Sequence, residues 1–255
     1  MRNGSRGAFL RTLPARSHTD VAAFFDASAP TYVEQHGEAE RLLRYRLELI
    51  REAARFQSVD TVLEVGCGTG LHLLALAPEF GRGLGIDLSP AMIEAARAER
   101  RRRCFDNRVD FSVGMGETLD SVTDASVDVV FCIGAIEHML DQTQVFQSAY
   151  RVLRTGGRFV CVTLNGGSIW YRYLAPALGF DTRRLSTDHY LGAGELRLLS
   201  SSAGFGTTKI DAWTFIQRGD IPRSIAHFLG ISDRIGKFMR LDRLRGGLRL
   251  AAVKA

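Results

Sequence analysis

A glycine-rich loop at residues 66–70 constrains the fold of this chain more than any other feature. An apolar run over residues 62–65 leads into Gly66-Cys67-Gly68-Thr69-Gly70, and a second apolar run follows over residues 71–77. Glycine has no Cβ, so it permits tight turns and lets a ligand approach the backbone closely. The pattern predicts a strand, a tight loop and then a helix whose N-terminal amides face that ligand.

A second strand is expected at residues 83–87, and it ends in an acid, Asp87. A carboxylate about 20 residues after the first glycine of such a loop can accept hydrogen bonds from ribose hydroxyls. Ser89 and Pro90 then suit the N-cap and the first turn of another helix. The loop is not a dinucleotide fingerprint, because Leu71 stands where the third glycine belongs, and it lacks the Lys-Ser/Thr of a P-loop. We therefore expect a nucleoside ligand without a phosphate.

Strand and helix patterns alternate through the middle of the chain. Strands are expected near residues 61–65, 83–87, 109–113, 127–133 and 157–163, with two more at 207–215 and 248–253. This alternation predicts an α/β fold with a parallel sheet that is covered on both faces. Ligands of such sheets lie beyond the carboxyl ends of the strands. Four of the residues considered below map to that edge: Glu64, Asp87, Met115 and Ile133.

Taken together, these motifs resemble those of the class I S-adenosylmethionine-dependent methyltransferases, in particular the group acting on small molecules and on quinone- or lipid-like acceptors. The matching segments, in order, are residues 64–70, 85–92, 126–138 and 150–160. The resemblance implies a Rossmann-like, doubly wound, mostly parallel seven-stranded sheet with one antiparallel strand and an N-terminal helical cap. It also implies S-adenosyl-L-methionine as the methyl donor and S-adenosyl-L-homocysteine as the product.

The resemblance further implies a set of cofactor contacts along the strand ends and the N-terminal cap. The expected contacts are Tyr32, Glu64, Gly66, Cys67, Gly68, Gly70, Asp87, Leu88, Met92, Met115, Gly116, Glu117, Ile133 and His138. Met115 departs from the family pattern, because an aspartate that binds the adenine amino group often stands there. Methionine cannot accept that hydrogen bond, so the contact is expected either to come from elsewhere, with the backbone of Gly116 and Glu117 as the candidate, or to be absent.

Methyl transfer from a sulfonium is an in-line displacement, in which alignment of donor and acceptor can supply up to about 7–11 kcal/mol. A general base adds about 10²–10⁴-fold and is needed only for a hydroxyl or an acidic carbon. His138 and His189 are the candidate bases, because histidine titrates near neutral pH. Trp170, Tyr173 and Tyr190 are candidate acceptor contacts; the alternative is that they pack a lid onto the sheet. No cluster has metal-ligand spacing, so no metal is expected.

Three regions are expected along the chain. Residues 1–19 carry four arginines and no acid, which is typical of a disordered basic tail, with a transit peptide as the alternative. Residues 20–57 form the helical cap. Residues 58–255 form the cofactor-binding domain, whose insertion at 165–201 is expected to supply the acceptor pocket.

Composition narrows the partners and the location. No apolar run reaches about 18 residues, so no membrane-spanning helix is predicted, and four cysteines without C-x-x-C spacing suit a reducing, cytoplasmic setting. A net charge of +5 suggests nucleic acid, but only three of the 33 basic residues are lysines, and a small-molecule acceptor is expected instead. The basic amphipathic segment 231–244 suits either packing on the sheet or peripheral membrane contact. A methyltransferase for RNA or protein and a non-catalytic cofactor-binding protein stay open as alternatives.

Overall fold

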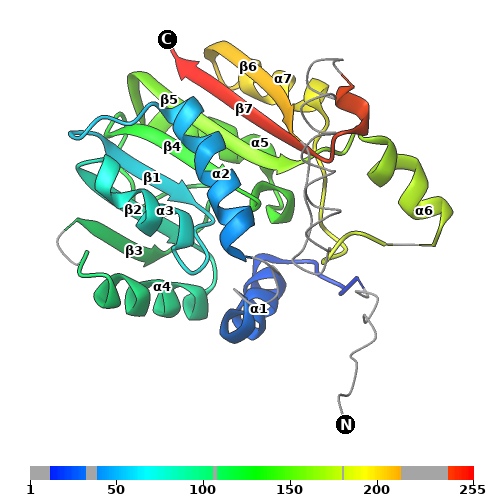
Figure 1. The fold of residues 1–255 in the computed structure, drawn as a ribbon, viewed down its shortest axis with the longest axis horizontal. Coiled ribbons are helices and arrows are strands. Elements are labelled where there is room, and N and C mark those ends of the chain that lie inside the picture. The colour runs from blue at the N-terminus through cyan, green and yellow to red at the C-terminus, as the bar shows by residue number, and fades with distance from the viewer. Residues whose placement is uncertain (1–11, 33–38, 106–107, 180, 214–240) are drawn as a thin grey trace.

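The computed structural model describes residues 12–32, 39–105, 108–179, 181–213 and 241–255. This part of the chain forms one seven-stranded sheet in the order β3-β2-β1-β4-β5-β7-β6 (Figure 1). The pairings among the first five strands are parallel, and β7 runs antiparallel to both of its neighbours. The predicted mostly parallel sheet with one antiparallel strand is therefore confirmed. The strands are β1 (Thr61–Val65), β2 (Arg82–Asp87), β3 (Val109–Val113), β4 (Val127–Ile133), β5 (Leu153–Leu164), β6 (Phe205–Trp213) and β7 (Gly247–Lys254).

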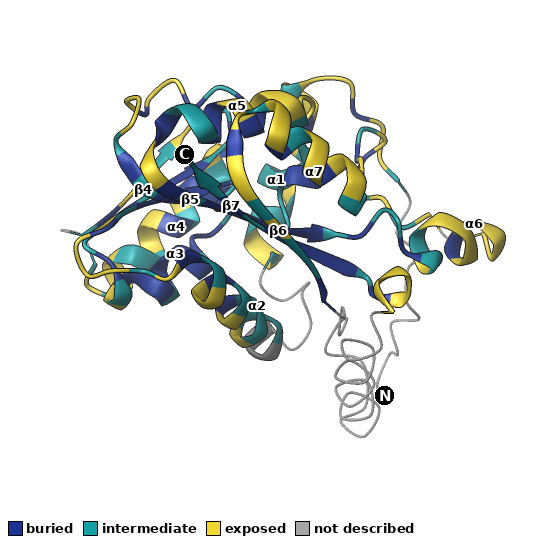
Figure 2. Cartoon of the chain, turned by 90° about the horizontal axis from the view of Figure 1, so that it is seen from above, coloured by how far each residue is buried: buried dark blue, intermediate teal, exposed yellow. Residues whose placement is uncertain are grey.

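Helices cover both faces of the sheet, and each face has its own apolar core (Figure 2). The longer helices are α1 (His18–Ser28), α2 (Ala39–Ala54), α4 (Pro90–Arg102), α5 (Gln142–Val152) and α7 (Ala193–Ser202). Shorter ones are η1 (Ala29–Thr31), α3 (Leu71–Leu76), η3 (Ala77–Glu79), η4 (Ile136–His138), η5 (Trp170–Leu174), α6 (Ala175–Ala177) and η6 (Asp242–Leu244). Helices α5 and α7 pack on one face, whereas α2, α3 and α4 pack on the other. None of the helices in the described ranges is both long and apolar enough to span a bilayer.

The central strands are buried on both faces, which explains why their sequences are almost continuously apolar. In β4, every residue from Val129 to Ile133 is buried. Helix α4 begins as expected, because the Ser89 side chain accepts a hydrogen bond from the Met92 amide and Pro90 follows as the first helical residue. The observed strand bounds differ from the expected ones by a few residues, and residues 214–215 of the sixth expected strand lie outside the described residues.

The structure differs from the expected disordered tail over residues 12–19. Leu13 forms a parallel bridge with Leu185, and Ala15 is buried. Ser17 and Asp20 form a capping box that starts α1 at His18. The basic composition of this stretch hid its local pattern of alternating apolar residues followed by a helix cap.

The amphipathic segment expected at 231–244 lies outside the described residues up to position 240. Within the remainder, Asp242–Leu244 form the single turn η6. The side-chain amide of Asn165, at the end of β5, donates hydrogen bonds to the carbonyls of Asp242 and Arg245. This contact fixes where the 165–201 insertion leaves the sheet.

Candidate active site

A cleft of about 620 Å³ opens at the carboxyl ends of β1, β2 and β4, where a doubly wound sheet is expected to bind its ligand. A neighbouring cleft of about 490 Å³ shares Tyr32, Gly66 and Gly68 with it, so the two meet around the glycine loop. The main cleft is lined by His18, Val21, Phe25, Tyr32, Gly66, Gly68, Ile86, Asp87, Leu88, Met92, Gly116, Glu117, Gly134, Ala135, His138 and Met139.

The glycine loop depends on glycine for both its conformation and its packing. Gly66, Gly68 and Gly70 have φ values of +69°, +51° and +75°, which side chains with a Cβ rarely adopt. A Cβ on Gly66 would lie 2.4 Å from the Ala135 Cβ, and a Cβ on Gly70 would lie 2.6 Å from the Phe111 ring. Gly66 and Gly68 line the main cleft, whereas Gly70 supports the loop from outside both clefts.

Asp87 lies at the end of β2, where it lines the main cleft and bonds to the glycine loop. Its Oδ2 accepts a 2.7 Å hydrogen bond from the Gly68 amide, and its Oδ1 accepts a 2.9 Å bond from the Ser89 amide. Burial raises the pKa of Asp87, while these amide bonds oppose the rise. Each carboxylate oxygen can accept a further hydrogen bond. Asp87 can therefore hold ribose hydroxyls without releasing the loop.

Glu64 lies beneath the loop and does not line either cleft. Its buried carboxyl group contacts His72 Nδ1 at 3.0 Å and accepts a 3.1 Å hydrogen bond from the Leu73 amide. Burial raises the pKa of Glu64 well above its usual value and lowers the pKa of His72 to about 3. The raised pKa of Glu64 and the lowered pKa of His72 both favour the neutral forms of these groups. The contact between them is therefore a buried hydrogen bond that links β1 to α3.

The His72 pKa predicts a pH-dependent loss of stability. Between about pH 6.5 and 3 the unfolded chain binds a proton at His72 that the folded protein does not, so stability falls as pH falls. The slope from this residue is at most about 1.4 kcal/mol per pH unit. His72→Gln keeps a donor for Glu64 but cannot titrate, so the free energy of unfolding of the wild type, measured relative to this variant, is expected to fall as the pH falls. Urea denaturation of both proteins from pH 6.5 to 4.5 measures this difference, and parallel curves would contradict it.

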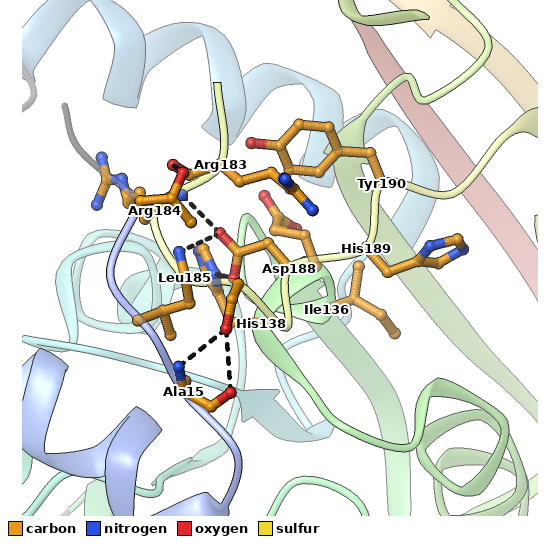
Figure 3. Close-up of polar contacts among 12 residues, drawn as sticks. Ala15, Ile136, His138, Arg183, Arg184, Leu185, Asp188, His189 and Tyr190 are labelled. Atoms are coloured by element: carbon orange, nitrogen blue, oxygen red, sulfur yellow. Dashed lines mark hydrogen bonds and ion pairs between the residues drawn. The ribbon is translucent and has the colours of Figure 1, made fainter. Parts of the chain in front are cut away.

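His138 is held at the cleft by a buried carboxylate. Its Nδ1 lies 2.7 Å from Oδ1 of Asp188, whose side chain is 0% exposed (Figure 3). Oδ2 of Asp188 accepts hydrogen bonds from the Arg184 and Leu185 amides at 2.8 and 3.0 Å. The Phe25 ring packs edge-on against the imidazole, with the ring centroids 5.2 Å apart. The ring of His138 is therefore fixed, and it contributes to the wall of the main cleft.

The second candidate base, His189, lies elsewhere. Its side chain is 59% exposed, contacts Glu195 Oε1 at 3.2 Å and points away from His138 (Figure 3). Only its backbone is tied to this region, because its amide donates to the Glu137 carbonyl. His189 lines neither cleft, so the described structure brings one of the two candidate bases to the ligand site.

The three candidate acceptor contacts also lie outside both clefts. Trp170 and Tyr173 are 44% and 59% exposed on the protruding η5–α6 segment (Figure 2). The Tyr190 hydroxyl donates a 2.6 Å hydrogen bond to the Thr182 carbonyl, and its ring packs against Tyr171. Tyr190 thus packs the insertion onto itself, and these contacts place it neither at a cleft nor, as the alternative expected, against the sheet.

Most of the expected cofactor contacts line the paired clefts. The main cleft takes Tyr32, Gly66, Gly68, Asp87, Leu88, Met92, Gly116, Glu117 and His138, and the second cleft adds Cys67 and Ile133. Glu64, Gly70 and Met115 lie outside both. Met115, at the position where the family often has its adenine-binding aspartate, therefore lines neither cleft. Its neighbours Gly116 and Glu117 line the main cleft.

Several lining residues were missed in the sequence. His18, Val21 and Phe25 come from α1, and Asp26 of that helix accepts hydrogen bonds from Ser89 and Ala91 of the α4 start. Arg46 lines the second cleft, and its Nε has no hydrogen-bond partner among the described residues. The sequence does mark Arg46, because it stands three residues after Leu43 and four before Ile50. This spacing puts a charged residue on the apolar face of α2, which faces the protein.

Comparison with known proteins agrees with this geometry. Residues 63–161 match the family described as a methyltransferase domain. The chain is 30% identical over 175 residues to a ubiquinone biosynthesis O-methyltransferase of Nitrosomonas europaea, covering 67% of this chain and 74% of that protein. It is 34% identical over 117 residues to a Saccharomyces cerevisiae protein named "Probable S-adenosylmethionine-dependent methyltransferase CRG1", covering 45% of this chain and 40% of that protein. For some curated relatives, the matched region is thus only about half of the relative's length.

A solved structure shows the same fold over nearly the whole chain. The match is to a chain of the complex between the Haloferax volcanii Trm112 methyltransferase activator and a methyltransferase, with 25% identity and a TM-score of 0.64. The alignment covers 90% of this chain and 96% of that one. The protein belongs to the class I S-adenosylmethionine-dependent methyltransferases, and its cofactor is S-adenosylmethionine.

Proposed function

We propose that this protein transfers the methyl group of S-adenosylmethionine to an oxygen or carbon atom of a small apolar or aromatic acceptor. The observation that carries the proposal is that Asp87, the glycine loop and His138 line one cleft. The proposed nucleoside site and the candidate base thus share one cleft. The names of two relatives, a ubiquinone biosynthesis O-methyltransferase and a malonyl-[acyl-carrier protein] O-methyltransferase of Hahella chejuensis, both specify transfer to oxygen and support this choice.

The residues present fit S-adenosylmethionine. Asp87 suits the ribose hydroxyls, and Val21, Leu88 and Met92 supply an apolar wall beside it for the adenine base. Arg46, with its cation beside the second cleft, suits the carboxylate of the methionine portion. The cofactor would supply a methyl group made electrophilic by the positive sulfur.

The protein's share of the chemistry is alignment and removal of one proton. His138 Nε2 takes the proton from an acceptor hydroxyl or acidic carbon as that atom bonds to the methyl carbon and the carbon–sulfur bond breaks. Val21, Phe25 and Met139 line the same cleft as His138, and their apolar side chains exclude water from this step. Alignment of the two reactants contributes the larger part of the rate, and the base adds about 10²–10⁴-fold.

An acceptor screen tests the proposed function. We expect release of S-adenosylhomocysteine in the presence of phenols, catechols or enolisable carbonyl compounds, measured with a coupled assay or by mass spectrometry of the methylated product. Transfer RNA and basic peptides serve as the macromolecular comparison. Turnover with RNA or peptide alone would contradict a small-molecule acceptor, and cofactor binding without turnover across both sets would favour a non-catalytic role.

A further inference from the structure

Asp188 is a buried carboxylate of the insertion that lines neither cleft and yet contacts a residue that does. Its two oxygens have different partners. Oδ2 accepts from the amides of Arg184 and Leu185, and Oδ1 faces Nδ1 of His138 at 2.7 Å (Figure 3). A role confined to shaping the 184–188 turn would need Oδ2 alone. The second oxygen therefore serves His138.

The contact determines which imidazole nitrogen carries the proton. An ionised carboxylate only accepts hydrogen bonds, so Nδ1 of His138 must be the donor in this pair. In neutral imidazole the other nitrogen, Nε2, then keeps its lone pair. A base at the cleft needs that free lone pair.

We propose that Asp188 is a positioning residue that fixes His138 in the tautomer with Nδ1 protonated and Nε2 free to accept a proton. The inference rests on the proposed function insofar as it assigns a use to that lone pair. Asp188 contacts neither cofactor nor acceptor in this arrangement and acts only through His138.

The turn that carries Asp188 is itself held by the N-terminal segment at residues 13–15. Leu13 exchanges backbone hydrogen bonds with Arg184 and Ser186 at 2.9 and 2.8 Å. The Ser186 hydroxyl accepts from the Ala15 amide and donates to the Ala15 carbonyl, at 2.9 and 3.0 Å. We call these contacts the clasp.

The clasp joins two functions that are far apart in the sequence. Residues 13–15 lead directly into α1, whose His18, Val21 and Phe25 cover the main cleft. The same segment thus covers the cofactor site and steadies the turn that orients His138. The clasp therefore couples the position of α1 over the cleft to the orientation of His138.

The decisive variant is Asp188→Asn. The Arg184 and Leu185 amides require an acceptor, so the asparagine oxygen takes the place of Oδ2 and its amide nitrogen faces His138. A donor at that position forces Nδ1 to accept and moves the imidazole proton to Nε2. Nitrogen-15 NMR of histidine-labelled, S-adenosylhomocysteine-bound full-length protein reads the tautomer directly. We expect protonated Nδ1 in the wild type, protonated Nε2 in Asp188→Asn, and a fall in kcat of about 10²–10⁴-fold.

Matched variants separate positioning from general loss of structure. Asp181→Asn changes a partly exposed carboxylate on the same segment and is expected to leave the tautomer and kcat unchanged. In a His138→Ala background, Asp188→Asn should cause no further loss of activity, because its effect passes through His138. Ser186→Ala, which removes only the side-chain bonds of the clasp, is expected to populate both tautomers.

The outcomes are distinct. An unchanged tautomer in Asp188→Asn, or a further loss of activity in the His138→Ala background, overturns the positioning role. If the spectrum of Ser186→Ala is identical to that of the wild type, the clasp has no part in fixing the tautomer of His138. A reversed tautomer with unchanged turnover supports the positioning role and instead contradicts His138 as the base.

Discussion

Replacing His138 with alanine is expected to lower kcat for a hydroxyl or acidic-carbon acceptor by about 10²–10⁴-fold. This corresponds to about 3–5 kcal/mol of activation free energy. The loss should appear in kcat, because the variant leaves the glycine loop and Asp87, the proposed cofactor contacts, unaltered. Steady-state kinetics together with titration of S-adenosylhomocysteine measure the two effects separately.

His189→Ala is the matched control for that prediction. This histidine lies 51 positions along the chain from His138 but only one residue from Asp188, and its side chain is exposed and lines neither cleft. We expect its kcat to stay close to that of the wild type. Equal losses in the two variants, or a loss confined to His189→Ala, would contradict the assignment of the base to His138.

Asp87→Ala is expected to weaken binding of S-adenosylmethionine and S-adenosylhomocysteine by at least about 100-fold. Hydrogen bonds to a charged group contribute about 1.5–3 kcal/mol each, so loss of two removes about 3–6 kcal/mol. The variant also deprives the Gly68 amide of its acceptor, which is expected to loosen the loop that lines the cleft. Isothermal titration calorimetry measures the change in Kd.

The control for Asp87→Ala is Asp110→Ala, which removes an exposed carboxylate from the neighbouring strand β3. Its Kd should match that of the wild type. Thermal denaturation of both variants shows whether the Asp87→Ala protein is folded. A folded Asp87→Ala protein with a Kd within about threefold of the wild type would contradict the proposed ribose contact.

The parts of the fold and site that were predictable from the sequence are those encoded by local pattern. Strands buried on both faces are nearly continuous apolar runs, so β1 and β4 were evident. Gly66, Gly68 and Asp87 follow directly from strand ends, where the topology of a parallel sheet leaves few choices. The Ser89 cap is equally local, since its acceptor and donor lie three residues apart.

The parts that were missed depend on contacts between distant segments. Asp188 meets His138 across 50 residues, and nothing in its own neighbourhood in the sequence marks it. Adjacent residues of an irregular segment can face opposite ways. The predicted base His189 therefore faces solvent, while its neighbour Asp188 contacts His138. Trp170 and Tyr173 were likewise predicted as acceptor contacts because they are aromatic. Residue type does not determine where a side chain points in a segment without a regular period.

Histidine resonances offer the most direct test of the central claim, which is that the cofactor and His138 share one cleft. In carbon-13 histidine-labelled protein titrated with S-adenosylhomocysteine, assigned by His→Gln variants, we expect the ring signals of His18 and His138 to shift as the ligand saturates. Both side chains line the main cleft, whereas His189 lies outside it, so the His189 signal should stay in place. Saturable binding that moves His189 but leaves His18 and His138 unchanged would contradict the placement of the active site.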